Sequence, residues 1–109
     1  MISRSGRNRT CALVETSFPD DERLERIPCG TRRAQALGVW VVALCHSRLH
    51  ELGGFCPMEV LQAFVGDETI QDLVDVGLFT RGEEDGLIGV VVINYAQFNG
   101  TKSKRKGMR

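Results

Sequence analysis

The chain has 109 residues, with 14 Lys and Arg against 14 Asp and Glu, so its formal net charge is zero. Its length suits one domain, and contents of 42% hydrophobic and 26% charged residues are ordinary for a globular protein. Fibrous, collagen-like and wholly disordered chains are therefore excluded. The longest apolar run, Val39–Cys45, is much shorter than the roughly 18 residues of a membrane span. No apolar segment follows the basic N-terminus, so we expect a cytoplasmic protein without a membrane partner.

The neutral sum conceals three segments of unlike charge. Residues 1–10 carry three arginines and no acidic residue, and residues 100–109 carry five Lys and Arg. Between them, residues 59–90 hold eight acidic side chains against Arg81 alone. We expect residues 1–10 to form a flexible basic arm, residues 11–99 one folded domain and residues 100–109 a flexible basic tail.

The cysteines and histidines give no strong sign of a metal or redox site. No two cysteines form a Cys-x-x-Cys pair, so we expect free thiols, with Cys45 and Cys56 buried. His46 and His50 are four residues apart on a predicted helix and could share a metal, with Cys56 as a third ligand. Two imidazoles near a helix end also complement its dipole, and we favour this interpretation because no second ligand pair is present. The sequence therefore predicts neither a metal nor a cofactor.

The first predicted elements lead up to one long helix. The apolar stretch 11–15 is typical of a short strand, and Asp20 is expected to cap a helical turn through Glu25. A helix then runs from an N-cap at Thr31 to about Leu52, with apolar side chains on nearly every face. Because of this distribution, we expect the rest of the domain to surround the helix.

Two shorter helices are predicted next. Gly53 and Gly54 end the long helix, and Pro57 opens the second helix. The third helix spans residues 68–76, capped by Asp67 and closed by Gly77. The buried stripe of the second helix is expected to contain Val60, Leu61, Phe64 and Val65. The outward residues of the third helix are expected to be Glu68, Gln71, Asp72 and Asp75.

A hairpin completes the predicted order. A strand over residues 78–80 and a β-branched run over residues 87–94 flank a charged turn that ends in Asp85-Gly86. A long helix, two short helices joined by a tight glycine-containing turn and a hairpin are the elements of a winged helix-turn-helix. We therefore predict an α+β, mainly α, fold in which the hairpin forms the wing.

Four stretches of the chain resemble a known family. They are Ala36-Leu37-Gly38-Val39-Trp40, Gly54-Phe55-Cys56-Pro57, Leu73-Val74-Asp75-Val76-Gly77-Leu78-Phe79 and Asp85-Gly86-Leu87. Together they resemble the pattern "aLGLWv…dGfvP…Lv.aGLw…dGy" of small phage and actinobacterial winged-helix proteins. Related domains stand at the N-termini of phage replisome-organiser proteins, and the resemblance covers about residues 12–98. The family often has Asp where this chain has Gly53, and the Trp of its GLW motif is Phe79 here.

The resemblance implies a phage-encoded protein of the bacterial host cytoplasm whose third helix enters the major groove of DNA. On that basis we predict a nucleic-acid-binding protein in transcription control or replication. The acidic third helix and wing oppose this role, because phosphates repel carboxylates. Arg32 and Arg33 are further phosphate-binding candidates. The predicted nucleic-acid contacts are Thr69, Gln71, Arg81, Lys102, Lys104, Arg105, Lys106 and Arg109.

The alternative is a small protein-interaction module that reads no bases. Its acidic third helix and wing would bind a host or phage protein, or the basic tail of another copy of the chain. A homodimer is a further possible assembly of the protein. The docking face would consist of Glu68, Asp72, Asp75, Glu83 and Glu84.

We expect no enzyme. Asp20-Asp21 and Glu83-Glu84 are adjacent carboxylates in polar turns, with no nucleophile or phosphate-binding loop beside them. Trp40 is predicted to anchor the core. Tyr95 and Phe98 are predicted to close the core, with base stacking beside the tail as the alternative.

Overall fold

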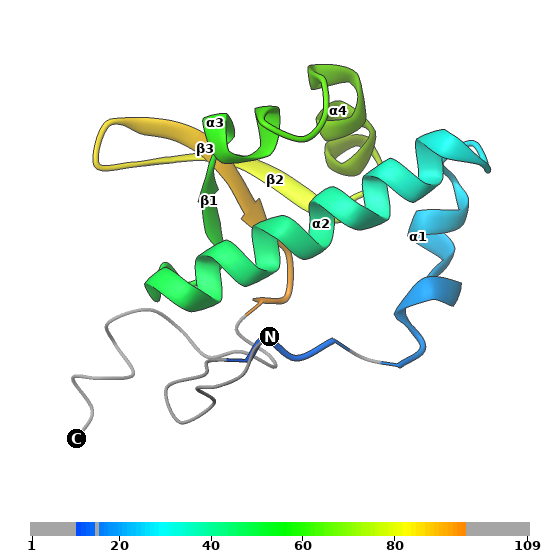
Figure 1. Cartoon of the computed structure of the whole chain (residues 1–109), viewed down its shortest axis with the longest axis horizontal. Helices are drawn as coiled ribbons and strands as arrows, with labels where there is room; N and C mark the ends of the chain where they lie inside the picture. Colours follow the sequence, from blue (N-terminus) through cyan, green and yellow to red (C-terminus); the bar gives the residue numbers. More distant parts are fainter. Residues whose placement is uncertain (1–10, 15, 96–109) are drawn as a thin grey trace, which may run out of the picture.

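The computed structural model describes residues 11–14 and 16–95 of the chain, and it confirms the α+β class (Figure 1). The proposed basic arm, the basic tail and Phe98 lie outside these residues. No helix in residues 11–14 and 16–95 has the length and apolar character needed to cross a membrane. The elements are a 3-10 turn (Phe18–Asp20), α1 (Glu22–Glu25), α2 (Thr31–His50), β1 (Phe55–Pro57), α3 (Met58–Gln62), α4 (Asp67–Asp75), β2 (Phe79–Glu84) and β3 (Leu87–Val92).

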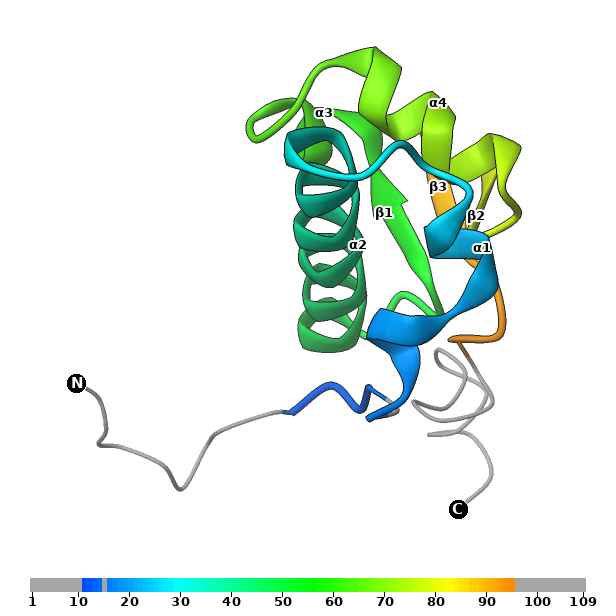
Figure 2. The ribbon, with the colours of Figure 1, turned by 90° about the vertical axis from the view of Figure 1, so that its right-hand side faces the viewer.

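The long helix α2 packs with one side only, so the expectation that the domain surrounds it was wrong. Figure 2 shows α2 on one side of the molecule, with the sheet, α1 and α4 on the other. Cys45 is exposed, contrary to prediction, because it lies on the outer side of this helix, whereas Cys56 is buried as predicted. The buried residues of α2 are Ala36, Val39, Trp40, Ala43, Leu44 and Ser47.

The N-terminal segment differs from its prediction in two respects. Residues 11–14 form no strand. The N-cap of α1 is Asp21 and not Asp20, since the Asp21 carboxylate accepts the Arg23 N–H at 2.8 Å. The side chain of Phe18 stacks on Trp40 with ring centroids 4.0 Å apart, so the prediction that Trp40 anchors the core is confirmed.

Several helix ends fall close to their predicted positions. The N-cap of α2 is Gly30, one residue before the predicted Thr31, and its left-handed terminating residue is Glu51, just before the predicted glycine pair. The N-cap of α4 is Gly66, so Asp67 is its first residue. Gly77 closes α4 as predicted, and the next residue, Leu78, donates its N–H to the Leu73 carbonyl at 2.9 Å.

The second helix is shorter than its predicted apolar stripe. It begins after Pro57, as expected, but ends at Gln62. Leu61 is fully buried, whereas Phe64 is 65% exposed and not buried as predicted. Phe64 lies in the turn over residues 63–66, where the helical periodicity no longer determines which side chains face the core.

The predicted hairpin is confirmed, with a longer first strand. The turn contains only Asp85 and Gly86, both with positive φ, as required for a tight type I′ connection. Four residues of the predicted turn, Arg81 to Glu84, pair with β3 instead. Tyr95, just beyond β3, is buried, which confirms its predicted core position.

A third strand, β1, was not predicted. It pairs antiparallel with β3, so the sheet order is β1-β3-β2. β1 has only three residues and ends in proline, so it has no pattern that distinguishes it from a loop.

Close contact between β1 and β3 depends on Gly89. A Cβ added at Gly89 would lie 2.2 Å from the Cys56 carbonyl oxygen and 2.9 Å from the Cα of Pro57. These neighbours are backbone atoms of a paired strand, so they cannot move aside without separating β1 from the sheet. Gly89 therefore allows the third strand to join the hairpin.

We expect Gly89→Ala to lower the free energy of unfolding by about 3 kcal/mol, because the new methyl group overlaps the β1 backbone. Urea unfolding followed by circular dichroism measures this change. Gly82→Ala is the matched control, since Gly82 faces Gly89 across β2 and β3 and its added Cβ would meet only a Val91 methyl group, at 3.1 Å. Equal losses in the two variants would contradict the role given to Gly89.

Candidate functional site

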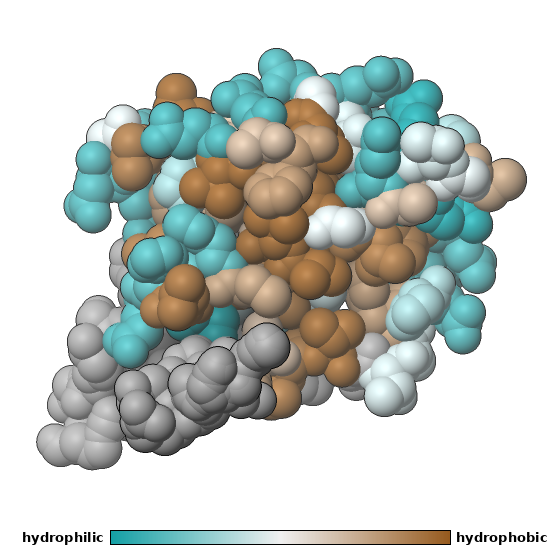
Figure 3. Space-filling view, viewed as in Figure 1, coloured by the Kyte–Doolittle hydropathy of each residue, from teal (hydrophilic) through white to brown (hydrophobic). Residues whose placement is uncertain are grey.

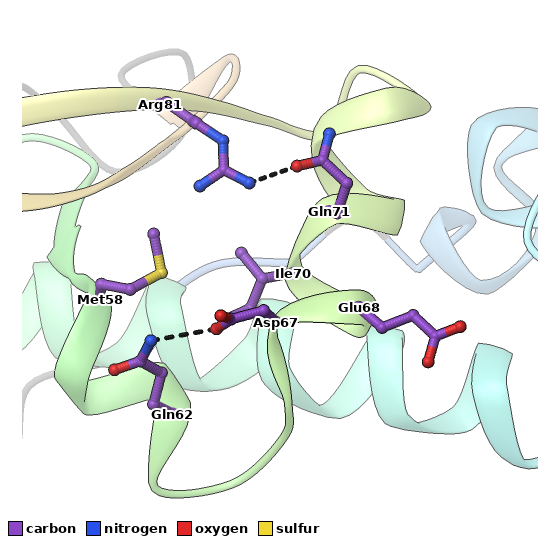
Figure 4. A pocket seen from close by; sticks show the side chains of 7 residues that line it. All are labelled: Met58, Gln62, Asp67, Glu68, Ile70, Gln71 and Arg81. Atoms are coloured by element: carbon purple, nitrogen blue, oxygen red, sulfur yellow. Dashed lines mark hydrogen bonds between the residues drawn. The ribbon is translucent and has the colours of Figure 1, made fainter.

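A cleft of about 430 Å³ lies where α3, α4 and β2 meet. Met58 and Ile70 supply apolar side chains to it, and Gln62, Asp67, Glu68, Gln71 and Arg81 supply polar ones (Figure 4). Gln71 and Arg81 were predicted as contacts, and the fold brings them together. Met58, Gln62, Asp67 and Ile70 were not predicted to belong to the site, since only the packing of α3 beside α4 shows that they share one cavity.

The side chains of Gln71 and Arg81 join α4 to β2 across this cleft. Arg81 donates a guanidinium N–H to the Gln71 Oε1 atom, and Gln71 donates its Nε2–H to Asp75 at 2.7 Å (Figure 4 shows the first of these bonds). On the other side, Gln62 donates to Asp67 at 3.0 Å. The cleft is thus bordered by amide and guanidinium groups held in defined positions, which suits them to hydrogen-bond a ligand.

Thr69, a predicted nucleic-acid contact, offers little surface to a ligand in this structure. The residue is only 6% exposed. Thr69 lies four residues before Leu73, and α4 turns both of them towards the core together with Ile70.

The acidic side chains of α4 are partly neutralised by an arginine of α2. Arg32 donates to both carboxylate oxygens of Asp72, at 2.7 and 2.8 Å, and its Nη2 atom lies 3.3 Å from Glu68. This ion pair lowers the pKa of the Asp72 carboxyl, chiefly through the hydrogen bonds from Arg32. Asp72 is half-buried and already paired, so of the predicted docking residues on α4 only Glu68 and Asp75 are well exposed.

The two arginines at the start of α2 are both engaged within the domain. Arg32 pairs with α4, and Arg33 donates to the backbone carbonyls of Ile27 and Glu25, each at 2.9 Å. The expectation that these two side chains could bind phosphate therefore finds no support in their contacts.

The hairpin tip combines acidic and apolar side chains. Ile88 is 67% exposed and Leu87 49% exposed, next to Glu83 and Glu84 on the paired strand. Glu83 is exposed and Glu84 is half-buried. We refer to residues 83–88 as the hairpin tip. Two adjacent large apolar residues directly after an Asp-Gly turn were the sequence signal for this surface.

The histidine pair does not extend to a three-ligand metal site. The His46 and His50 rings lie 4.4 Å apart, and the pKa of His46 is lowered, first by burial and then by His50. Cys56, the suggested third ligand, is fully buried, and burial raises the pKa of its thiol to about 12. Among the residues described, no three His, Cys, Asp or Glu side chains are grouped to hold a metal ion.

The remaining predicted contacts are in the C-terminal segment. Lys102, Lys104, Arg105, Lys106 and Arg109 all lie outside the described residues.

A scan against protein-family models finds no match for this chain. Searches of the curated proteins and of the solved structures find no significant match either.

We expect Asp72→Asn to destabilise the domain at neutral pH, because it leaves Arg32 without its bidentate partner. The folded-state pKa of Asp72 is lowered, so its contribution is fully present above the unfolded-state pKa of about 4 and is lost as the pH falls through the folded value. The urea midpoints of wild type and variant should therefore converge in acid. Asp75→Asn is the control, since Asp75 accepts from the neutral Gln71. A difference that persists in strong acid would contradict the prediction.

Proposed function

We propose that this domain is a winged helix-turn-helix that binds nucleic acid through α4 and the hairpin. The turn over residues 63–66 contains Gly66 and joins α3 to α4, which fits the helix-turn-helix motif. The strand β1 pairs with β3 and so adds a third strand to the hairpin. We also propose, from the sequence resemblance, a phage-encoded protein that acts in transcription control or replication by binding and not by catalysis.

The position of Gln71 beside Arg81 is the observation that carries this proposal. A glutamine amide can pair with the N6 and N7 atoms of adenine, and an arginine with guanine or with a phosphate. One of these residues comes from the helix and the other from the wing, and their hydrogen bond holds both at the cleft. A base edge or phosphate that enters the cleft would replace this bond with its own.

The charge of the site requires a second source of affinity. Arg81 is the only Lys or Arg in residues 59–90, so the cleft can offer few phosphate contacts. The three arginines of residues 1–10 and the five basic residues 102–109 supply the positive charge that the cleft lacks. We therefore propose that the cleft orients the domain on nucleic acid while the terminal segments provide most of the affinity.

We expect Arg81→Ala to weaken binding to duplex DNA about tenfold and to reduce the slope of log K against log salt by about 1. Gln71→Ala should instead relax the preference between sequences, by about 1–3 kcal/mol at one base pair. Fluorescence anisotropy over a salt series and a randomised duplex library measures both. Arg26→Ala, at the exposed end of α1, is the control. No binding at low salt by the wild-type chain would rule out this function.

The hairpin tip favours a second candidate function. Ile88 and Leu87 are exposed, and Glu83 lies beside them. Such a surface fits a protein partner that is apolar in its centre and basic at its rim, whereas the DNA backbone is negatively charged and would repel Glu83. On this reading the domain binds a basic host or phage protein through the hairpin tip, together with Glu68 and Asp75 of α4.

Reversing one charge at the hairpin tip separates the two functions. If the tip approaches DNA, Glu83→Lys should raise the affinity about tenfold at low salt and steepen the salt slope by about 1, since one repulsive group becomes a phosphate contact. If the tip binds a basic protein, the affinity for DNA stays unchanged and Glu83→Lys abolishes capture of that protein. Glu22→Lys, on α1, controls for the change in net charge.

A further inference from the structure

The outer side of α2 carries an apolar stripe along the whole helix. It consists of Ala34, Gly38, Val41, Cys45 and Leu49, which are all exposed, and we call these residues the α2 stripe. Val41 is 39% and Leu49 64% exposed, and none of the five residues is charged. Figure 3 shows apolar surface crossing the middle of the face that α2 occupies in Figure 1.

Gly38 is the unexpected member of the stripe. Glycine is a poor helix former, yet Gly38 lies in the interior of a 20-residue helix. A Cβ added there would meet nothing within 4 Å, so the packing of the domain does not require glycine at this position. A missing side chain on an exposed helix face allows a second backbone to approach closely. Gly38 thus points to a partner outside the domain.

We propose that the α2 stripe binds the α2 stripe of a second copy of this chain, with the two helices antiparallel about a two-fold axis beside Val41. In this register Gly38 faces the partner's Cys45, and Ala34 faces the partner's Leu49. The two smallest residues of the stripe, Ala34 and Gly38, lie in its N-terminal half, so in this register each of them meets a larger residue. An antiparallel pair of the same helix is therefore self-complementary in size, as a two-fold interface must be.

The two terminal segments of the chain lack the apolar composition that would match the α2 stripe. Residues 1–10 and 96–109 contain eight Lys and Arg and no acidic residue. Their large apolar residues are only the adjacent pair Met1 and Ile2, together with Phe98 and Met108, and the rest are mostly polar. A second α2 stripe supplies the continuous apolar surface that these segments lack.

The area of the stripe indicates a reversible dimer. The stripe from Ala34 to Leu49 is about 22 Å long and the helix about 12 Å wide, so the stripe covers roughly 270 Å² in each copy. The turn over residues 63–66, which carries the exposed Phe64, projects on the same side of the molecule as α2 (Figure 2). With Phe64 of both copies included, the total stays below roughly 1,000 Å², the size of a weak and transient complex. This proposal does not depend on nucleic-acid binding.

Sedimentation velocity from micromolar to millimolar concentration tests the dimer. We expect the wild type to dimerise in this range, and Gly38→Leu to weaken dimerisation by at least about tenfold, because a leucine side chain prevents the close approach of the helices. The variant should keep the far-UV circular dichroism of the wild type, since the added side chain meets open space. Gln35→Leu, exposed on the flank of the same helix, should leave the dissociation constant unchanged. A wild type that stays monomeric, or a Gly38→Leu variant that dimerises equally well, overturns the proposal and leaves the stripe to a different partner.

Disulfide trapping tests the register separately. In a background with Cys11 and Cys29 replaced by serine, Gly38→Cys should form a covalent dimer through the partner's Cys45 under mild oxidation. Adding Cys45→Ala should abolish this dimer. A dimer that persists without Cys45 would mean that the two introduced cysteines meet, which a parallel pair predicts, and it would overturn the antiparallel arrangement.

Discussion

The close approach of β1 to β3 at Gly89 is the contact on which the rest of the domain depends. The Cys56 carbonyl lies where a Cβ of residue 89 would stand, so the sheet gains its third strand only with glycine there. Since β1 joins α2 to α3, its pairing fixes where one helix ends and the next begins. The buried Ser47 hydroxyl secures the same junction by accepting the Gly54 N–H at 2.6 Å.

This junction sets α2 against the sheet and leaves its outer side exposed. Trp40 and Phe18 stack on the packed side, and Arg23 of α1 binds both Asp21 and the Gly77 carbonyl after α4. The N-terminal segment is thereby attached to the same layer as α4. The result is a helix with two unlike sides, one that completes the core and one that carries the α2 stripe.

The charges of the chain are likewise divided in space. Arg32 neutralises part of the acidic α4, while the hairpin tip keeps its carboxylates next to exposed apolar side chains. The cleft between them contains the hydrogen-bonded Gln71 and Arg81. A count of charges along residues 59–90 merges these three surfaces, although they differ in charge and in polarity.

The elements that could be predicted from the amino-acid sequence are those whose signals are local. The three- and four-residue spacing of apolar side chains in α2 and α4, the stop at Gly77 and the Asp85-Gly86 turn all act between near neighbours. Four features could be recognised only from the packed fold: the pairing of β1 with β3, the Arg32–Asp72 ion pair, the burial of Thr69 and the exposure of Cys45. Each depends on how elements far apart in the chain pack together, as with the 40 residues between Arg32 and Asp72. A periodic pattern shows that a helix has an apolar side, but only packing decides whether the domain or a partner covers it.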